Sequence, residues 1–175
     1  MQKQLERVGW GVKWSVEKFA KRDILDAGLD LLTPSPELKR LITPADVLEG
    51  EGNLLLNEGI AEMWLLITGG AGTAFSNANS YLAVGNSATA ASASDTDLLG
   101  ASKFYATMVA TWPQITAQTC QWKADFTDAQ ANFAWAEWSV ANGSSGTAEN
   151  LNRKVAALGT KASGTWTLTV DITLS

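Results

Sequence analysis

The sequence contains no histidine and one cysteine among its 175 residues. Without histidine the chain has no Ser-His-Asp or Cys-His catalytic set, no imidazole ligand for zinc, and none of the usual proton shuttles near neutral pH. A single cysteine, Cys120, excludes an internal disulfide. Cys120 falls on the apolar side of an alternating stretch, and this placement favours a buried thiol over a nucleophile.

Long apolar runs and a basic excess are also lacking. No run of about 18 apolar residues is present to span a membrane, and the start carries no signal-peptide pattern, so we expect a soluble protein made in the cytoplasm. The net charge of -5 argues against a nucleic-acid partner, which needs a basic surface. Eight of the 13 basic residues lie within the first 40 positions, which sets the amino-terminal region apart from the rest.

The carboxyl-terminal stretch has the clearest pattern in the chain. Every even position from Trp166 to Leu174 is apolar, and the odd positions from Thr165 to Ser175 carry threonine, aspartate or serine. Because successive side chains of a β-strand point to opposite faces, this stretch predicts a long strand with one buried face. The buried face of such a strand requires a second layer of secondary structure to pack against it and form a core.

Five further stretches predict strands, and glycine- and serine-rich turns separate them. These are residues 81–85, 103–112, 119–126, 134–141 and 153–158. Together they predict a mainly β fold, an antiparallel β-sandwich or jelly-roll-like domain. One helix, at about 57–68 and ending at a pair of glycines, is expected to pack its wide apolar face on the sheet.

The first 50 residues are expected to form a helical N-terminal arm, followed by a β-rich domain over residues 51–175. Apolar residues recur at helical spacing from Lys13 to Leu32, and breaks are predicted at Pro34 and Pro44. Since each helical piece carries little apolar area, we expect the arm to dock on a neighbouring protein. The alternative is a helical layer packed on the protein's own sheet.

Six large apolar residues are candidates for contacts with a partner. Five lie on the arm, where aromatic anchors would suit a docking contact. The sixth is a tryptophan out of phase with Trp138, which places it under a loop, at a subunit contact or on a binding surface. Exposed indoles stack on sugars, so carbohydrate binding is an open alternative. The candidates are Trp10, Trp14, Phe19, Leu38, Leu41 and Trp135.

Groups that suggest chemistry are few. Asp95 and Asp97 resemble a fragment of a metal site, but a capping or turn role is favoured for so short a motif. The carboxylates Asp125, Asp128 and Glu137 would serve glycoside hydrolysis only if two of them converged, and all three fall at positions expected to face solvent. We therefore predict no catalytic residue, no cofactor and no metal.

Six segments after residue 51 form a recognisable pattern. They are Gly52-Asn-Leu-Leu-Leu-Asn-Glu-Gly59, Gly69-Gly-Ala-Gly-Thr-Ala-Phe-Ser-Asn-Ala-Asn-Ser-Tyr81, Val84-Gly-Asn-Ser87, Ala131-Asn-Phe-Ala-Trp-Ala-Glu-Trp138, Leu151-Asn-Arg-Lys-Val-Ala-Ala-Leu-Gly-Thr-Lys161 and the final Thr-Trp-Thr-Leu-Thr-Val stretch. This pattern resembles that of tailed-bacteriophage virion proteins. The resemblance implies a non-enzymatic structural component of the virion, assembled in the host cytoplasm.

A capsid decoration or cement protein is the first functional expectation. Its β domain would sit on the outer shell, and the arm would reach across neighbouring subunits of the major capsid protein and strengthen their joints. Local symmetry favours a homotrimer or homodimer. The alternatives are a tail, baseplate or fibre component with a receptor- or carbohydrate-binding role, and a stand-alone carbohydrate-binding module. No membrane partner is expected.

Overall fold

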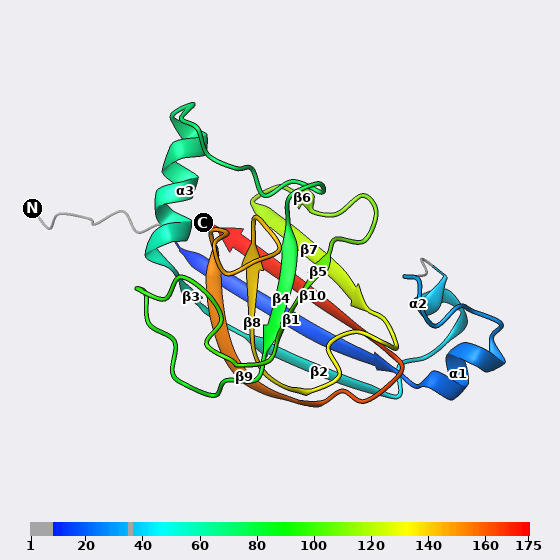
Figure 1. Cartoon of the computed structure of the whole chain (residues 1–175). Coiled ribbons are helices and arrows are strands. Elements are labelled where there is room, and N and C mark those ends of the chain that lie inside the picture. Colours follow the sequence, from blue (N-terminus) through cyan, green and yellow to red (C-terminus); the bar gives the residue numbers. More distant parts are fainter. Residues whose placement is uncertain (1–8, 35–36) are drawn as a thin grey trace, which may run out of the picture.

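The computed structural model describes residues 9–34 and 37–175, which form two five-stranded antiparallel sheets (Figure 1). The first sheet has the order β2 (Asp46–Glu51), β1 (Trp10–Phe19), β10 (Thr165–Leu174), β7 (Thr119–Phe126), β6 (Gln114–Thr116). The second has the order β3 (Leu54–Leu55), β9 (Asn152–Thr160), β8 (Ala134–Ala141), β4 (Tyr81–Gly85), β5 (Lys103–Thr107). The predicted mainly β class is confirmed, and the two sheets are consistent with a β-sandwich.

The final strand, β10, lies at the centre of the first sheet, as its alternation predicts. It pairs with β1 over ten residues, from Trp10↔Leu174 to Phe19↔Thr165, and on its other edge with β7. Its apolar residues from Trp166 to Ile172 are buried in the main core, to which both sheets contribute. The predicted buried face is therefore confirmed.

Residues 10–19 form strand β1, so the helix predicted to begin at Lys13 is wrong there. Trp10, Val12, Trp14 and Val16 alternate with polar or small residues, and this two-residue period decides the structure because β10 and β2 pair with the two edges of β1. The described residues show no helical arm at this position. Residues 1–8, which the arm prediction includes, lie outside the described residues.

Strand β2 lies at the end of the region that is expected to form a helical arm. Its residues pair with β1 from Lys13↔Glu51 to Lys18↔Asp46. Gly50 leaves room for the Trp14 ring, which a side chain at that position would strike. Most of the first 50 residues that the structure describes thus belong to, or pack on, the sheet that contains β10.

Two short helices, α1 (Lys21–Asp26) and α2 (Leu38–Leu41), pack at one end of the first sheet (Figure 1). A second small core forms there from Phe19, Ile24, Leu38 and Ile42. Phe19 lies on the outer face of the sheet, away from the main core. The region matches the alternative expectation of a helical layer on the protein's own sheet. Within the described residues no helix is long and apolar enough to cross a membrane.

Candidate functional site: a buried ionic cluster and an exposed apolar helix

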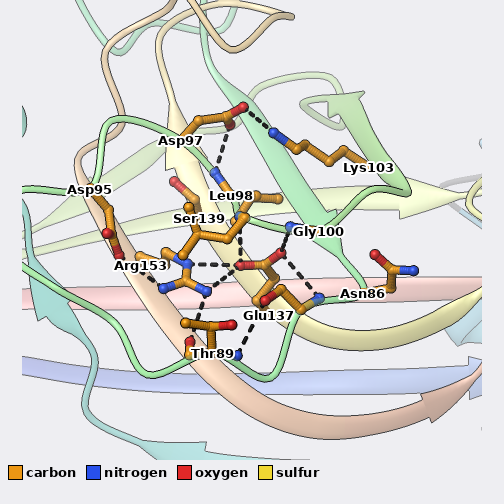
Figure 2. A network of polar contacts seen from close by, with 12 residues as sticks. Asn86, Thr89, Asp95, Asp97, Leu98, Gly100, Lys103, Glu137, Ser139 and Arg153 are labelled. Atoms are coloured by element: carbon orange, nitrogen blue, oxygen red, sulfur yellow. Dashed lines mark hydrogen bonds and ion pairs between the residues drawn. The ribbon is translucent and has the colours of Figure 1, made fainter.

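The outer face of the second sheet carries a buried ion pair (Figure 2). Glu137 on β8 and Arg153 on β9 are both fully buried, and 2.6 Å separates Arg153 Nη2 from Glu137 Oε2. Arg153 Nε donates to the same oxygen at 2.7 Å. A buried pair of this kind is stable only where the remaining donors and acceptors are also bonded.

The loop between β4 and β5 supplies those bonds to Glu137. The backbone N–H groups of Ser87, Leu99 and Gly100 donate to the carboxylate at 3.3, 3.1 and 2.7 Å. Each oxygen of Glu137 therefore accepts at least two hydrogen bonds. The cluster ties the loop to the sheet and leaves no carboxylate oxygen exposed to a substrate.

Asp95 and Asp97 belong to the cluster and its rim, as Figure 2 shows. Asp95 Oδ2 lies 2.9 Å from Arg153 Nη1. Asp97 pairs with Lys103 and accepts a hydrogen bond from the Tyr105 hydroxyl, and burial together with this bond raises the pKa of Tyr105. Both aspartates thus fix the loop. The described residues contain no group of three or more His, Cys, Asp or Glu side chains arranged to hold a metal ion.

The three carboxylates considered for glycoside hydrolysis do not converge. Glu137 lies on the outer face of the second sheet, whereas Asp125 lies on the outer face of the first and accepts the Thr167 hydroxyl at 2.6 Å. Asp128 follows β7 and accepts the Gly164 N–H at 2.7 Å, and this bond lowers the pKa of Asp128. Glu137 and Asp125 are buried, so their predicted exposure to solvent is wrong. Both side chains are covered by segments distant in sequence.

Helix α3 (Asn57–Ile67) confirms the helix predicted at about 57–68, but it is anchored through its polar side. Glu58 Oε1 accepts the Asn150 N–H at 2.6 Å, and burial raises the pKa of Glu58. The buried Glu62 accepts the Asn142 side-chain N–H at 3.1 Å. These bonds fasten one side of the helix to the segment between β8 and β9.

Gly59 brings the α3 backbone close to that segment. A Cβ atom at Gly59 would lie 2.5 Å from the carbonyl oxygen of Leu151 and 2.7 Å from its Cα atom. Only a residue without a side chain allows this approach. The anchored side of α3 therefore combines two glutamates and a glycine.

The apolar side of α3 faces away from the protein. Ile60, Trp64 and Ile67 form one stripe at helical spacing, and 62% of Trp64 and 72% of Ile67 are exposed. The prediction that the apolar face packs on the sheet is therefore wrong for these three residues, whereas the neighbouring Met63 does pack against the main core. A surface helix of a globular protein normally turns its apolar stripe to the core. Figure 1 shows α3 projecting beside the end of β10.

A groove beside α3 extends this apolar surface. Its volume is about 310 Å³, and Met63 of α3, Leu174 of β10 and Ile115 of β6 are among the residues that line it. Ile115 is 79% exposed. Cys120 also lines the groove, and partial burial raises the pKa of its thiol to about 11, which keeps it protonated near neutral pH. We call the following residues the apolar end surface: Ile60, Trp64, Ile67, Ile115 and Leu174.

The six candidate contact residues lie mainly inside the protein. Phe19 and Leu38 are buried in the small core beside α1 and α2. Trp10 and Trp14 are half-buried against the main core. Leu41 is the most accessible of the six, with 49% of its surface exposed.

Trp135 is buried in the main core rather than on a surface. The pairing of β8 with β9 shifts register between Trp135 and Glu137, and this irregularity lets Trp135 and Trp138 both face the core. The Trp135 ring packs edge-on against Phe126 and Trp166, with ring centroids 4.6 and 4.8 Å apart. Its indole N–H donates to the Ala131 carbonyl at 2.9 Å.

The apolar end surface was missed by the sequence-based candidates. A signal for it exists, because Glu58 and Glu62 stand four residues apart on the helix and mark a polar side separate from the apolar stripe. That spacing alone does not say which side is anchored. No family model, no curated protein and no solved structure matches the chain, so no relative supplies a role for this surface.

Proposed function

We propose that the protein is a non-enzymatic structural component of a tailed-bacteriophage virion and attaches to a neighbouring virion protein through the apolar end surface. The observation that carries this proposal is the orientation of α3, whose glutamates point inward while Trp64 and Ile67 point outward. The resemblance of six sequence segments to virion proteins supplies the setting. The fully bonded cluster around Glu137 favours a structural role for the second sheet.

Burial of the apolar end surface would provide the contact energy. Fully burying one large apolar side chain contributes about 1.5–3 kcal/mol. Trp64, Ile67 and Ile115 are exposed by 62, 72 and 79%, so most of their area is free to be covered. Tryptophan is also enriched among the residues that dominate binding energy at protein interfaces.

The exposed side of α3 offers apolar rather than charged contacts. No lysine or arginine occurs between Gly52 and Lys103, and both glutamates of α3 lie on its anchored side, away from the apolar stripe. The partner we propose is therefore another virion protein that presents an apolar groove to this stripe. A homotrimer or homodimer, which stays a prediction, would use another surface.

Within the virion we propose that the protein decorates the outer shell and binds the major capsid protein. The described part of the expected arm is core strand and covering helices, so attachment falls to the apolar end surface instead. A tail or fibre component with a carbohydrate-binding role is the second candidate. A cavity on the outer face of the first sheet, described below, favours it.

Replacement of Trp64 and Ile67 by serine tests the attachment. We expect the double variant to remain folded but to be lost from purified virions, measured by quantitative gel staining and by circular dichroism of the isolated protein. The matched control replaces Leu25 and Leu32, which are 54 and 65% exposed in the segment around α1, and should be incorporated normally. Equal incorporation of both variants would contradict the proposed surface.

Copy number in the same gels separates the two virion positions. A decoration protein should be present in numbers comparable to the major capsid protein. A tail component should be present in far fewer copies, and that result would contradict the decoration role while leaving the attachment surface intact.

A further inference from the structure

A cavity of about 480 Å³ lies on the outer face of the first sheet. Its floor contains Lys123 and Asp125 of β7, and its walls are Pro34 and the segment 108–112 that follows β5. Cavities of this size hold small organic ligands or a single sugar unit. The cavity is separate from the apolar end surface and shares none of its residues.

Lys123 is a half-buried cation at this cavity. Among the described residues no carboxylate oxygen lies within ion-pair distance of its ammonium group. The Nζ atom lies 5.1 Å from the centroid of the Trp112 ring. Burial, with a contribution from the charge of Lys39, lowers the pKa of Lys123. The carboxylates of Asp125 and Glu17 act on Lys123 from beyond ion-pair distance. A carboxylate on a ligand would add a direct partner through a charge-assisted hydrogen bond.

The wall that carries Trp112 is held in a fixed conformation. Asn77 donates its side-chain N–H to the carbonyl oxygens of Val109, at 3.2 Å, and of Trp112. The Trp112 indole N–H donates to Gln121 at 2.9 Å. Thr111 has a φ of 75°, a value that β-branched residues rarely adopt. Strain of this kind concentrates at binding sites, where it keeps groups in a preorganised geometry.

Asp125 adds a hydrogen-bonding carboxyl group beside Lys123. Its Oδ1 atom accepts the Thr167 hydroxyl at 2.6 Å, and its Oδ2 atom accepts no hydrogen bond from the residues that the structure describes. Burial raises the pKa of Asp125. The free oxygen is suited to a ligand hydroxyl.

A row of polar side chains leads from Trp112 across the open part of the same face. Strand register places Gln121 beside Asp171, Asp171 beside Lys13, and Lys13 beside Glu51. Gln121 also donates to Asp171 at 2.7 Å. Such a row offers hydrogen-bonding groups to neighbouring units of a longer sugar chain.

We propose that this cavity binds an acidic sugar unit. The carboxylate of the sugar pairs with Lys123, one face of its ring lies against Trp112, and a ring hydroxyl binds Asp125. An uncharged sugar would lack the ion pair, and a simple carboxylate would lack the hydroxyl contacts. This site goes beyond the proposed attachment and adds recognition of a charged glycan.

Titration of the full chain with glucuronate, glucose and benzoate tests the assignment. The readout is the indole N–H signal of Trp112 in two-dimensional NMR, assigned by its loss in Trp112→Phe. We expect a saturable shift with glucuronate and at least tenfold weaker binding of glucose and of benzoate. No saturable shift with glucuronate would overturn the proposal. Equal binding of benzoate would show that the cavity recognises a carboxylate but not a sugar, and would overturn the proposal. Equal binding of glucose would show that Lys123 does not contribute to binding, and would also overturn it.

Two lysine variants locate the ion pair. Lys123→Met should weaken glucuronate binding at least tenfold, whereas Lys154→Met, which removes a half-buried lysine of the second sheet, should not change it. Lys123→Arg, which keeps the charge, should retain part of the affinity and guards against a Lys123→Met variant that fails to fold. Unchanged binding by a folded Lys123→Met variant would overturn the proposal. The Trp64 and Ile67 variants should bind glucuronate normally, so failure of attachment and failure of the sugar site are distinguishable.

Discussion

The outer faces of the two sheets are covered by different physical means. On the second sheet, the loop between β4 and β5 is held by the buried Glu137–Arg153 pair and its hydrogen bonds. On the first sheet, α1 and α2 cover one end through apolar contacts around Ile24, the segment 108–112 borders β7, and the part that carries Lys13 stays open. A charged cover depends on every partner being present, because one uncompensated buried charge is costly. Removing one residue from an apolar cover loses only the contacts of that residue. Such a cover can also unfold locally while the sheet beneath it stays intact.

The largest expected effect comes from removing the cation of the charged cover. Arg153→Met leaves Glu137 buried without its partner, and we expect the free energy of unfolding to fall by about 3–5 kcal/mol. Urea denaturation followed by tryptophan fluorescence measures the change. Lys154→Met is the matched control, because Lys154 is the next residue on β9 and donates to the exposed Glu51 carbonyl, so its loss should cost less than about 1 kcal/mol. An equal decrease in the free energy of unfolding in the two variants would contradict the view that the buried ion pair holds the loop on the second sheet.

Truncation within the apolar cover should have a smaller and more local effect. Ile24 is fully buried in the small core beside α1, so Ile24→Ala should cost about 2–3 kcal/mol in that region. Hydrogen exchange should show faster opening of residues 20–45 with little change in β4, β8 or β9. Leu25→Ala, at a neighbouring residue that is 54% exposed, should change stability by about 0.5 kcal/mol or less. Uniformly faster exchange throughout the sandwich would show that the cover does not open separately.

Asp125, unlike Glu137, is a buried carboxyl group without an ion-pair partner within reach among the described residues, and this difference predicts a pH dependence. Burial raises its pKa in the folded protein above the ordinary value of 3.8, so the folded state holds its proton over a pH range in which the unfolded state has lost it. Wild-type stability contributed by this group is therefore fully present below pH 3.8 and falls as the pH rises through the raised pKa. Asp125→Asn should therefore gain stability relative to wild type as the pH rises from 3.5 to 7, measured by urea denaturation at both values. A constant difference would contradict the raised pKa.

The smallest expected effect concerns two threonines on the open part of the first sheet. The Thr169 hydroxyl is buried and has no hydrogen-bond partner among the described residues, so Thr169→Val should raise the free energy of unfolding by about 0.5–1 kcal/mol. Thr173 lies on the same face of β10 and its hydroxyl is 2.7 Å from that of Thr119. Thr173→Val should therefore lower stability by about 0.5–1 kcal/mol. Thermal melting of the two variants should give shifts of opposite sign, and shifts of the same sign would refute the assignment.

Uninterrupted alternation is the part of the fold that could be predicted from sequence. The even positions from Trp166 to Ile172 are buried as expected. The same period is present at Trp10, Val12, Trp14 and Val16, but apolar residues that continue at helical spacing after them favoured a helix. Pairing with β10, more than a hundred residues later in the chain, selects the strand, and local patterns do not contain that information.

The burial of the candidate site residues depends still more on contacts between segments that are distant in sequence, so it could not be predicted from local patterns. Trp135 was assigned outward because alternation assumes a regular strand, whereas the register shift beside Glu137 turns its ring inward. Glu137 itself was expected in solvent, because no local feature indicates that a loop fifty residues earlier in the chain covers it. Likewise, the exposure of Trp64 follows from where Asn142 and Asn150 lie, and they hold the opposite side of α3.

The central place of β10 has a consequence for how the chain folds. It is the last strand in chain order, yet it separates β1 from β7 and pairs with both over most of its length. During synthesis the first sheet therefore lacks its middle strand until residues 165–174 have left the ribosome, and β1 until then has only β2 as a neighbour. Pairings between segments so distant in sequence form slowly because a long loop must close first. Folding of the first sheet is thus expected to wait for the synthesis of β10, with the apolar faces of β1 and β7 uncovered until β10 arrives.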